Sequence, residues 1–247
     1  RTESAGFLFM GYRKFRAEFV QLIDVNTFAL TEDYRLGLDL AAELRYASRA
    51  FGFSSAFIQP VASLSSTWLW GEDIFSVGAA AEARYQPEAG PGTGTPGSTS
   101  NWVNGLASLR VRNVSPWFWR LRLHTHALLL RRQNNLNRDF SSLGGDTSLR
   151  GYPSGYLSGT QLWNGNVELR TSPVSFLTVH AGVVGFLDLG GAANQLANLG
   201  THASAGAGLR VLFPQFNRSV LRLDLGFPLE AVAGTPAYFS AQYGQAF

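Results

Sequence analysis

The chain has 247 residues, of which 15% are charged, 45% hydrophobic and 13% aromatic. It contains no cysteine, which excludes disulfide scaffolds, cysteine-ligated metal sites and thiol catalysis. The formal charge of +3 is too small to indicate nucleic-acid binding. Soluble domains usually carry about 25% charged residues, so this chain is unusually poor in charge. It must therefore bury its apolar side chains in a core or expose them to lipid on one face.

Apolar and polar side chains alternate with a period of two along the chain. In residues 34–46, Tyr34 and every second residue after it are apolar, whereas Asp39 and Glu43 lie on the other parity. This alternation is typical of a β-strand with one apolar face. We predict about twelve such segments, at residues 5–12, 14–24, 34–47, 55–70, 73–86, 102–113, 116–131, 160–171, 174–188, 203–213, 217–227 and 237–247. Many reach the roughly 9–11 residues that a tilted strand needs to cross a bilayer.

The connections between these segments also alternate in length. Longer links follow the third, fifth, seventh, ninth and eleventh segments, and short turns follow the even-numbered ones from the fourth to the tenth. The links after the first two segments do not follow this rule. Long loops at one end and tight turns at the other are typical of an outer-membrane barrel, which must close because lipid offers no hydrogen-bond partner. We therefore predict an all-β transmembrane antiparallel β-barrel, as a single domain over residues 1–247.

Three motifs go beyond a generic barrel. The first lies in the longest link, residues 132–159, and consists of Leu149, Arg150, Gly151 and Tyr152. The second consists of Phe186, Asp188 and Gly190, and the third is a C-terminal alternation of Phe239, Tyr243 and Phe247. Together they resemble the barrel of the BamA-type outer-membrane assembly-factor superfamily, also called the bacterial surface antigen family. That superfamily includes two-partner secretion transporters and barrels fused to patatin-like domains.

The resemblance implies a role for each motif. The link 132–159 is expected to fold into the lumen, where Arg150 meets Asp188. Arg222 and Asp224 lie on the lumen parity and belong either to the same network or to a separate polar ladder. The C-terminal alternation is expected to be the insertion signal. Typical members have sixteen strands, so any strands beyond the twelve would precede the first segment.

The resemblance also implies a function, namely insertion or translocation of proteins at the outer membrane of a Gram-negative bacterium. The expected partners are outer-membrane lipids and unfolded outer-membrane or secreted proteins. The alternatives are a passive outer-membrane pore or scaffold barrel and, third, an outer-membrane lipid hydrolase. No Gly-x-Ser-x-Gly elbow is present, and His124 and His126 lie on the inner parity without an evident third ligand. We therefore predict no enzymatic activity, no cofactor and no metal.

Overall fold

The computed structural model describes residues 6–87, 101–145, 148–216, 218–230, 232, 234 and 236–245. Nearly all of the regular structure in these ranges is strand, with two short 3-10 helices, η1 (Arg49–Phe51) and η2 (Leu196–Asn198). The strands are β1 (Leu8–Phe15), β2 (Glu18–Ile23), β3 (Thr31–Ala47), β4 (Phe57–Trp70), β5 (Asp73–Tyr85), β6 (Trp102–Val114), β7 (Leu121–Gln133), β8 (Ser141–Leu143), β9 (Leu157–Gly159), β10 (Gln161–Thr171), β11 (Val174–Phe176), β12 (Val179–Ala193), β13 (His202–Leu212), β14 (Leu221–Pro228) and β15 (Tyr238–Tyr243). No helix in the described part of the chain is long and apolar enough to cross a membrane.

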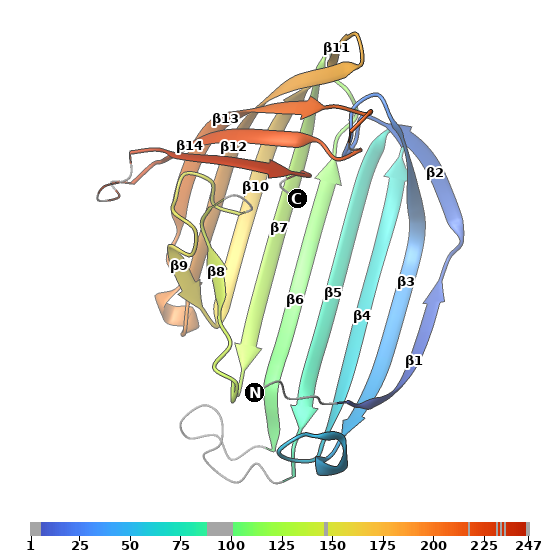
Figure 1. Ribbon diagram of the computed structural model, residues 1–247, viewed down its shortest axis with the longest axis vertical. Coiled ribbons are helices and arrows are strands. Elements are labelled where there is room, and N and C mark those ends of the chain that lie inside the picture. The colour runs from blue at the N-terminus through green and yellow to red at the C-terminus, as the bar shows by residue number, and fades with distance from the viewer. Residues whose placement is uncertain are drawn as a thin grey trace.

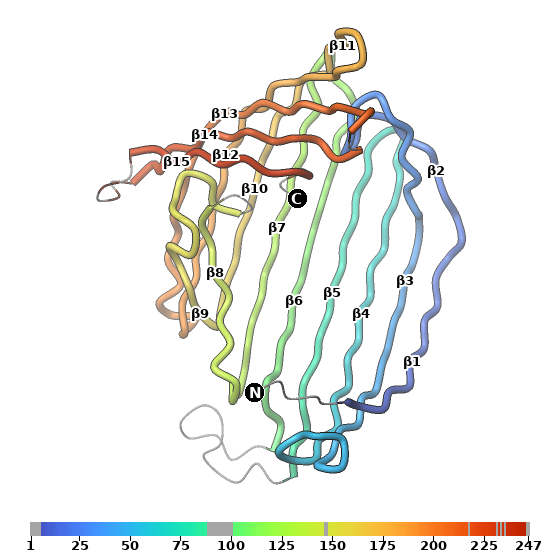
Figure 2. Tube along the Cα trace, viewed as in Figure 1, coloured from blue at the N-terminus to red at the C-terminus, as the bar shows by residue number. Residues whose placement is uncertain are grey.

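One antiparallel sheet contains almost all of these strands. Its order is β1-β3-β4-β5-β6-β7-β10-β12-β13-β14-β15, with β2 beside β3 and β11 beside β12. The sheet twists strongly, so that β3 to β7 run lengthwise while β13 and β14 cross the upper part of the molecule (Figure 1). The Cα trace shows the same curvature carried on to β15 (Figure 2). The prediction of an all-β antiparallel barrel fold is confirmed.

The first two predicted segments share one position in the sheet. The strand β1 pairs with residues 39–46 of β3, and β2 pairs with residues 31–36 of the same strand. The predicted segments 5–12 and 14–24 therefore lie one after the other along β3. They are not the two arms of a hairpin. This arrangement removes one of the two exceptions in the link pattern, because residues 16 and 17 do not join two arms of a hairpin. The link 24–30 lies at the short-turn end and is longer than a tight turn.

A local irregularity changes which side chains of β3 face inward. Gly37 has a φ of 79°, a left-handed conformation that interrupts the regular strand geometry. Before it, Tyr34 packs against the buried cluster of Val25, Ile74 and Val114, whereas Leu38, after it, is exposed. The prediction that Tyr34 shares one face with the apolar residues up to Tyr46 is wrong, because the alternation is reversed across the left-handed Gly37.

Burial along β10 is the inverse of that in a soluble protein. Asn164, Asn166, Glu168 and Arg170 are buried on the concave side of the sheet, whereas its outward-facing Val167 is exposed. Large apolar side chains are exposed on most strands, and aromatic ones lie near both strand ends, including Trp68, Trp70, Trp102 and Phe176. An apolar exterior around a polar interior is the arrangement of a transmembrane β-barrel.

Candidate functional site

The link between β7 and β10 folds back onto the inner wall and has a core of its own. Within it, β8 pairs with β9, and the backbone N of Gly145 donates to the carbonyl oxygen of Tyr152 at 2.8 Å. Leu143, Leu149 and Tyr152 form a buried cluster with Leu162 of β10. The two short strands lie beside β10 and β12 (Figure 1). The link is thus an ordered insert held against the concave face of the sheet.

Arg150 of this link makes a paired hydrogen bond with Asp188 on β12. Its Nε and Nη2 atoms each donate to a carboxylate oxygen of Asp188 at 2.8 Å, and its backbone N donates to Oδ2 at 3.0 Å. The Arg150 side chain is 1% exposed and that of Asp188 is 0% exposed. The guanidinium carbon also lies 3.6 Å from the ring centre of Phe186. Such bidentate, charge-assisted contacts fix both the position and the orientation of the loop.

The same guanidinium reaches two further carboxylates. Its Nη1 atom lies 2.9 Å from Oε1 of Glu168 on β10 and 3.4 Å from Oδ2 of Asp224 on β14. Arg210 on β13 bridges the same two acids, at 2.5 Å from Glu168 Oε1 and 2.5 Å from Asp224 Oδ1. Arg150 thereby contacts three strands directly, and the acids that it shares with Arg210 connect it to β13.

Two more arginines complete this buried network. Arg170 donates to Oε2 of Glu168 at 2.8 and 2.5 Å. Arg222 lies 3.4 Å from Asp224 and donates to Gln242 of β15 at 2.9 Å. The network therefore joins three carboxylates to four guanidiniums, and every charge is within reach of an opposite one. Removing one member of such a buried set leaves an uncompensated charge, which is strongly destabilising.

The charge of Arg150 is maintained by this environment. Burial by itself lowers the pKa of the guanidinium, because the charged form loses its hydration. The hydrogen bonds to Asp188 and the negative charges of Asp188, Glu168 and Asp224 outweigh that effect and raise the pKa above its ordinary value. Arg150 is therefore a permanent cation in the lumen.

Glycines leave room for the loop backbone against the wall. A Cβ atom added at Gly226 of β14 would lie 2.6 Å from the carbonyl carbon of Arg150. Gly151 has a φ of 116°, and a Cβ there would lie 2.9 Å from Cβ of Ser204 on β13. The side chain of Arg150 can reach the acids only because Gly151 and Gly226 have no side chains where the loop meets the wall.

The structure brings most of the predicted site residues together. In the loop motif, Leu149, Arg150 and Tyr152 are buried, and Tyr152 Oη donates to the carbonyl oxygen of Ala203 at 3.0 Å. A Cβ at Gly190 would lie 2.9 Å from Leu143, so the glycine of the second motif also accommodates the loop. Arg222 and Asp224 belong to the same network as Arg150. Phe239 and Tyr243 are exposed on β15, at 61% and 65%, and Phe247 lies outside the described residues.

Sequence reasoning missed several members of the network, namely Asn166, Glu168, Arg170 and Arg210. Asn166 donates to the carbonyl oxygen of Ser148 at 2.6 Å and to Asp188 Oδ1 at 2.9 Å. A signal for the two β10 residues was present, since Glu168 and Arg170 alternate with Val167 and Leu169 in a chain with few charges. Their partners could not be read from that alternation. No cluster of three potential metal ligands occurs among the described residues.

A second inward segment lies at the short-turn end. This cap segment, residues 24–30 between β2 and β3, buries Val25 and Phe28. The carbonyl oxygens of Asp24 and Val25 accept hydrogen bonds from Arg122 at 3.3 Å and Arg170 at 3.2 Å, respectively. Gln245, beyond β15, donates to the carbonyl oxygen of Asn26 at 2.7 Å. The cap segment therefore connects the beginning of the chain to the inner wall and to the region after the last strand.

Comparison with known proteins agrees with this architecture. The family model of the Omp85 superfamily domain matches residues 118–247, which contain β7 to β15, the inward link and the whole buried network. The chain belongs to the Omp85 superfamily, which confirms the resemblance inferred from the sequence motifs.

Among solved structures, the chain is similar to CdiB from Escherichia coli, with a TM-score of 0.62 and 18% sequence identity. The similarity covers 96% of this chain and 44% of CdiB, so the chain spans less than half the length of that protein. At this identity the likeness concerns the fold. No curated protein matches the chain.

Proposed function

We propose that this protein takes part in the insertion or translocation of other proteins at the outer membrane of a Gram-negative bacterium. The observation that carries the proposal is the loop residue Arg150, held by Asp188 inside a barrel-type sheet of the Omp85 superfamily. The network cross-links β10, β12, β13 and β14 on the inner wall. Its partners would be outer-membrane lipids and unfolded outer-membrane or secreted proteins.

The edges of the sheet supply a physical route for such an activity. The hydrogen-bonded path begins at β1 and ends at β15, and no pairing joins these two strands in the described ranges. An edge strand presents backbone N–H and C=O groups to which a client strand can add. Met10 and Tyr12 of β1 are 74% and 60% exposed, and they would extend the apolar exterior towards the apolar face of an added strand.

The proposal is tested by the folding rate of a small outer-membrane barrel in liposomes that contain this protein. We expect the client to fold faster than in empty liposomes, as measured by its heat-modifiable migration in electrophoresis. The Asp188→Asn variant should lose part of this acceleration because it weakens the paired hydrogen bonds with Arg150. An unchanged client folding rate, together with no transport of a secreted client, would contradict the proposal.

A passive pore is the second candidate, because the inner wall of the first half is polar. A groove of about 500 Å³ lies along β4, β5 and β6 and is lined by residues that include Ser63, Ser65, Thr67, Arg110 and Arg112. Planar-bilayer recordings separate the two functions. Steady conductance without any effect on client folding would favour the pore.

A further inference from the structure

The cap segment, residues 24–30, is a compact loop with hydrogen bonds of its own. Three successive backbone N–H groups, those of residues 25–27, donate to Oε1 of Glu32 at 3.2, 2.8 and 2.8 Å. The backbone N of Ala29 donates to Oδ1 of Asp24 at 2.6 Å, which joins the two ends of the loop. Because these bonds hold the loop together from within, the cap segment can move as one unit.

Many contacts attach the cap segment to the first half of the sheet. It is continuous with β2 and β3, and Val25 belongs to a buried cluster with Ile74 of β5 and Val114 of β6. Arg112 of β6 donates to Oδ1 of Asn26 at 2.5 Å. Its carbonyl oxygens accept the hydrogen bonds from arginines of β7 and β10 that are described above. We therefore expect the cap segment to stay with these strands when other parts of the sheet move.

Only a few of its contacts reach the opposite edge. Phe28, which is 4% exposed, packs with Leu212 at the end of β13 and with Val220 just before β14. A Cβ atom added at Gly182 of β12 would lie 3.1 Å from Cζ of Phe28, so the glycine leaves room for the ring. Beyond β15, Gln245 donates one hydrogen bond of 2.7 Å to the cap backbone. The loop after β2 accordingly lies beside the turn between β13 and β14 (Figure 1).

The two edges that the cap segment joins have no strand pairing with each other. In the described ranges, β1 and β2 pair with β3 alone, and β15 pairs with β14 alone. A closed barrel is held at every position by backbone hydrogen bonds between neighbouring strands. At the short-turn end, Phe28 and Gln245 supply a connection where that pairing is absent.

We propose that the cap segment is a releasable latch between the two edges of the sheet. While Phe28 is packed against Leu212 and Val220, the edges are held at a fixed separation. When Phe28 leaves this position, the cap segment remains with the first half, and β13 to β15 can move away from it. A client strand can then add to the free backbone of β1 or β15. This use of the latch rests on the proposed function, but the movement itself can be measured without a client.

Spin-label distance measurements between the two edges test the latch in the detergent-purified protein. The chain contains no cysteine, so Gln21→Cys on β2 and Ala241→Cys on β15, both at exposed positions, introduce two unique labels. We expect one narrow distance distribution in the otherwise wild-type protein. Phe28→Ala should add a population at longer distance. Gln245→Ala should add a smaller one, because it removes a single neutral hydrogen bond.

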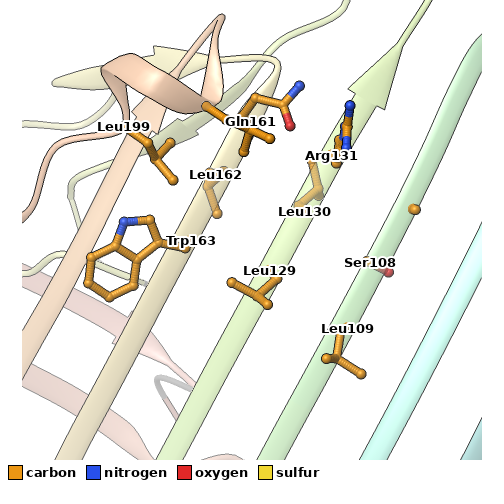
Figure 3. Close-up of a pocket in the computed structure, with 11 residues that line it drawn as sticks. Ser108, Leu109, Leu129, Leu130, Arg131, Gln161, Leu162, Trp163 and Leu199 are labelled. Carbon is orange, nitrogen blue, oxygen red and sulfur yellow. The ribbon is translucent and has the colours of Figure 1, made fainter.

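Two control variants remove apolar contacts that do not reach the opposite edge. Val25→Ala shortens a residue of the cap segment that packs on β5 and β6. Leu199→Ala shortens a residue of the link after β12, which lies beside Trp163 of β10 (Figure 3). These two residues line an apolar groove of about 330 Å³ on the outer wall, over the middle of the sheet. Both controls should keep the wild-type distance distribution.

An unchanged distance distribution in Phe28→Ala would overturn the proposal. Equal broadening in Val25→Ala or Leu199→Ala would also overturn it, because the effect would then be a general loosening of the sheet. If Phe28→Ala fails to fold, as judged by its heat-modifiable migration, Gln245→Ala decides by the same criterion. Separation of the edges in Phe28→Ala with no change in the client folding rate would instead support the latch and contradict only the proposed function.

Discussion

Arg13 and Arg150 both form paired hydrogen bonds with an aspartate, in opposite halves of one sheet. Arg13 of β1 donates to Asp39 of β3 at 3.1 and 2.7 Å, and Arg150 donates to Asp188 at 2.8 and 2.8 Å. The exposed fractions of the side chains are 58% and 14% in the first pair but 1% and 0% in the second. The geometry is similar, so burial is what makes the second pair a structural centre and leaves the first a surface contact.

The difference comes from what covers the inner wall. In the first half, β4 has a single buried residue, Phe57, and the polar groove beside it stays open. In the second half, the link between β7 and β10 fills the concave side, and alternate residues of β10 are buried. An inward loop thus converts a polar lumen wall into a core of charged groups.

The largest effect is expected from removing the buried guanidinium. Arg150→Met should lower the free energy of unfolding by about 3–5 kcal/mol, because it leaves Asp188 and its neighbouring acids without their shared cation. Urea unfolding in detergent, followed by tryptophan fluorescence, measures this change. A loss below about 1 kcal/mol, the size expected for an exposed pair, would show that the two halves do not differ as described.

An intermediate effect is expected from closing the space for the loop. Gly226→Ala should cost about 1–3 kcal/mol through overpacking, and it should expose the bond after Arg150 to trypsin, with cleavage located by mass spectrometry. Gly11→Ala on β1 is the matched control in the first half, where the nearest atom to an added Cβ would be 3.8 Å away. Continued protection of Arg150 in Gly226→Ala would contradict the close approach of loop and wall.

The smallest effect is expected in the exposed pair. Arg13→Met should change the free energy of unfolding by less than about 1 kcal/mol, because solvent screens the pair and Arg35 also contacts Asp39. The same urea titration provides the measurement, and high salt should reduce the difference further. A cost equal to that of Arg150→Met would mean that burial is not the deciding factor.

Some members of the buried network can be predicted from the sequence and others cannot. The resemblance to the superfamily predicts Asp188 as the partner of Arg150, and the parity of Arg222 and Asp224 predicts that both face the lumen. Arg210 is surrounded by small and apolar residues in the sequence, and nothing there indicates that it bridges Glu168 and Asp224. That contact depends on the register of β13 with β14 and on the curvature of the sheet.

The sequence by itself determined the strand composition, the apolar exterior, the alternation of long and short links, and the loop motif, because each depends on neighbouring residues or on a local period of two. Only the tertiary structure decided that β1 and β2 lie in line beside β3, that Gly37 reverses the alternation before it, and that the cap segment turns inward. These features depend on hydrogen-bond register and on the backbone conformation of one glycine. Neither the register nor this conformation changes the alternation of apolar and polar residues enough to be recognised in the sequence. Both determine which side chains come into contact.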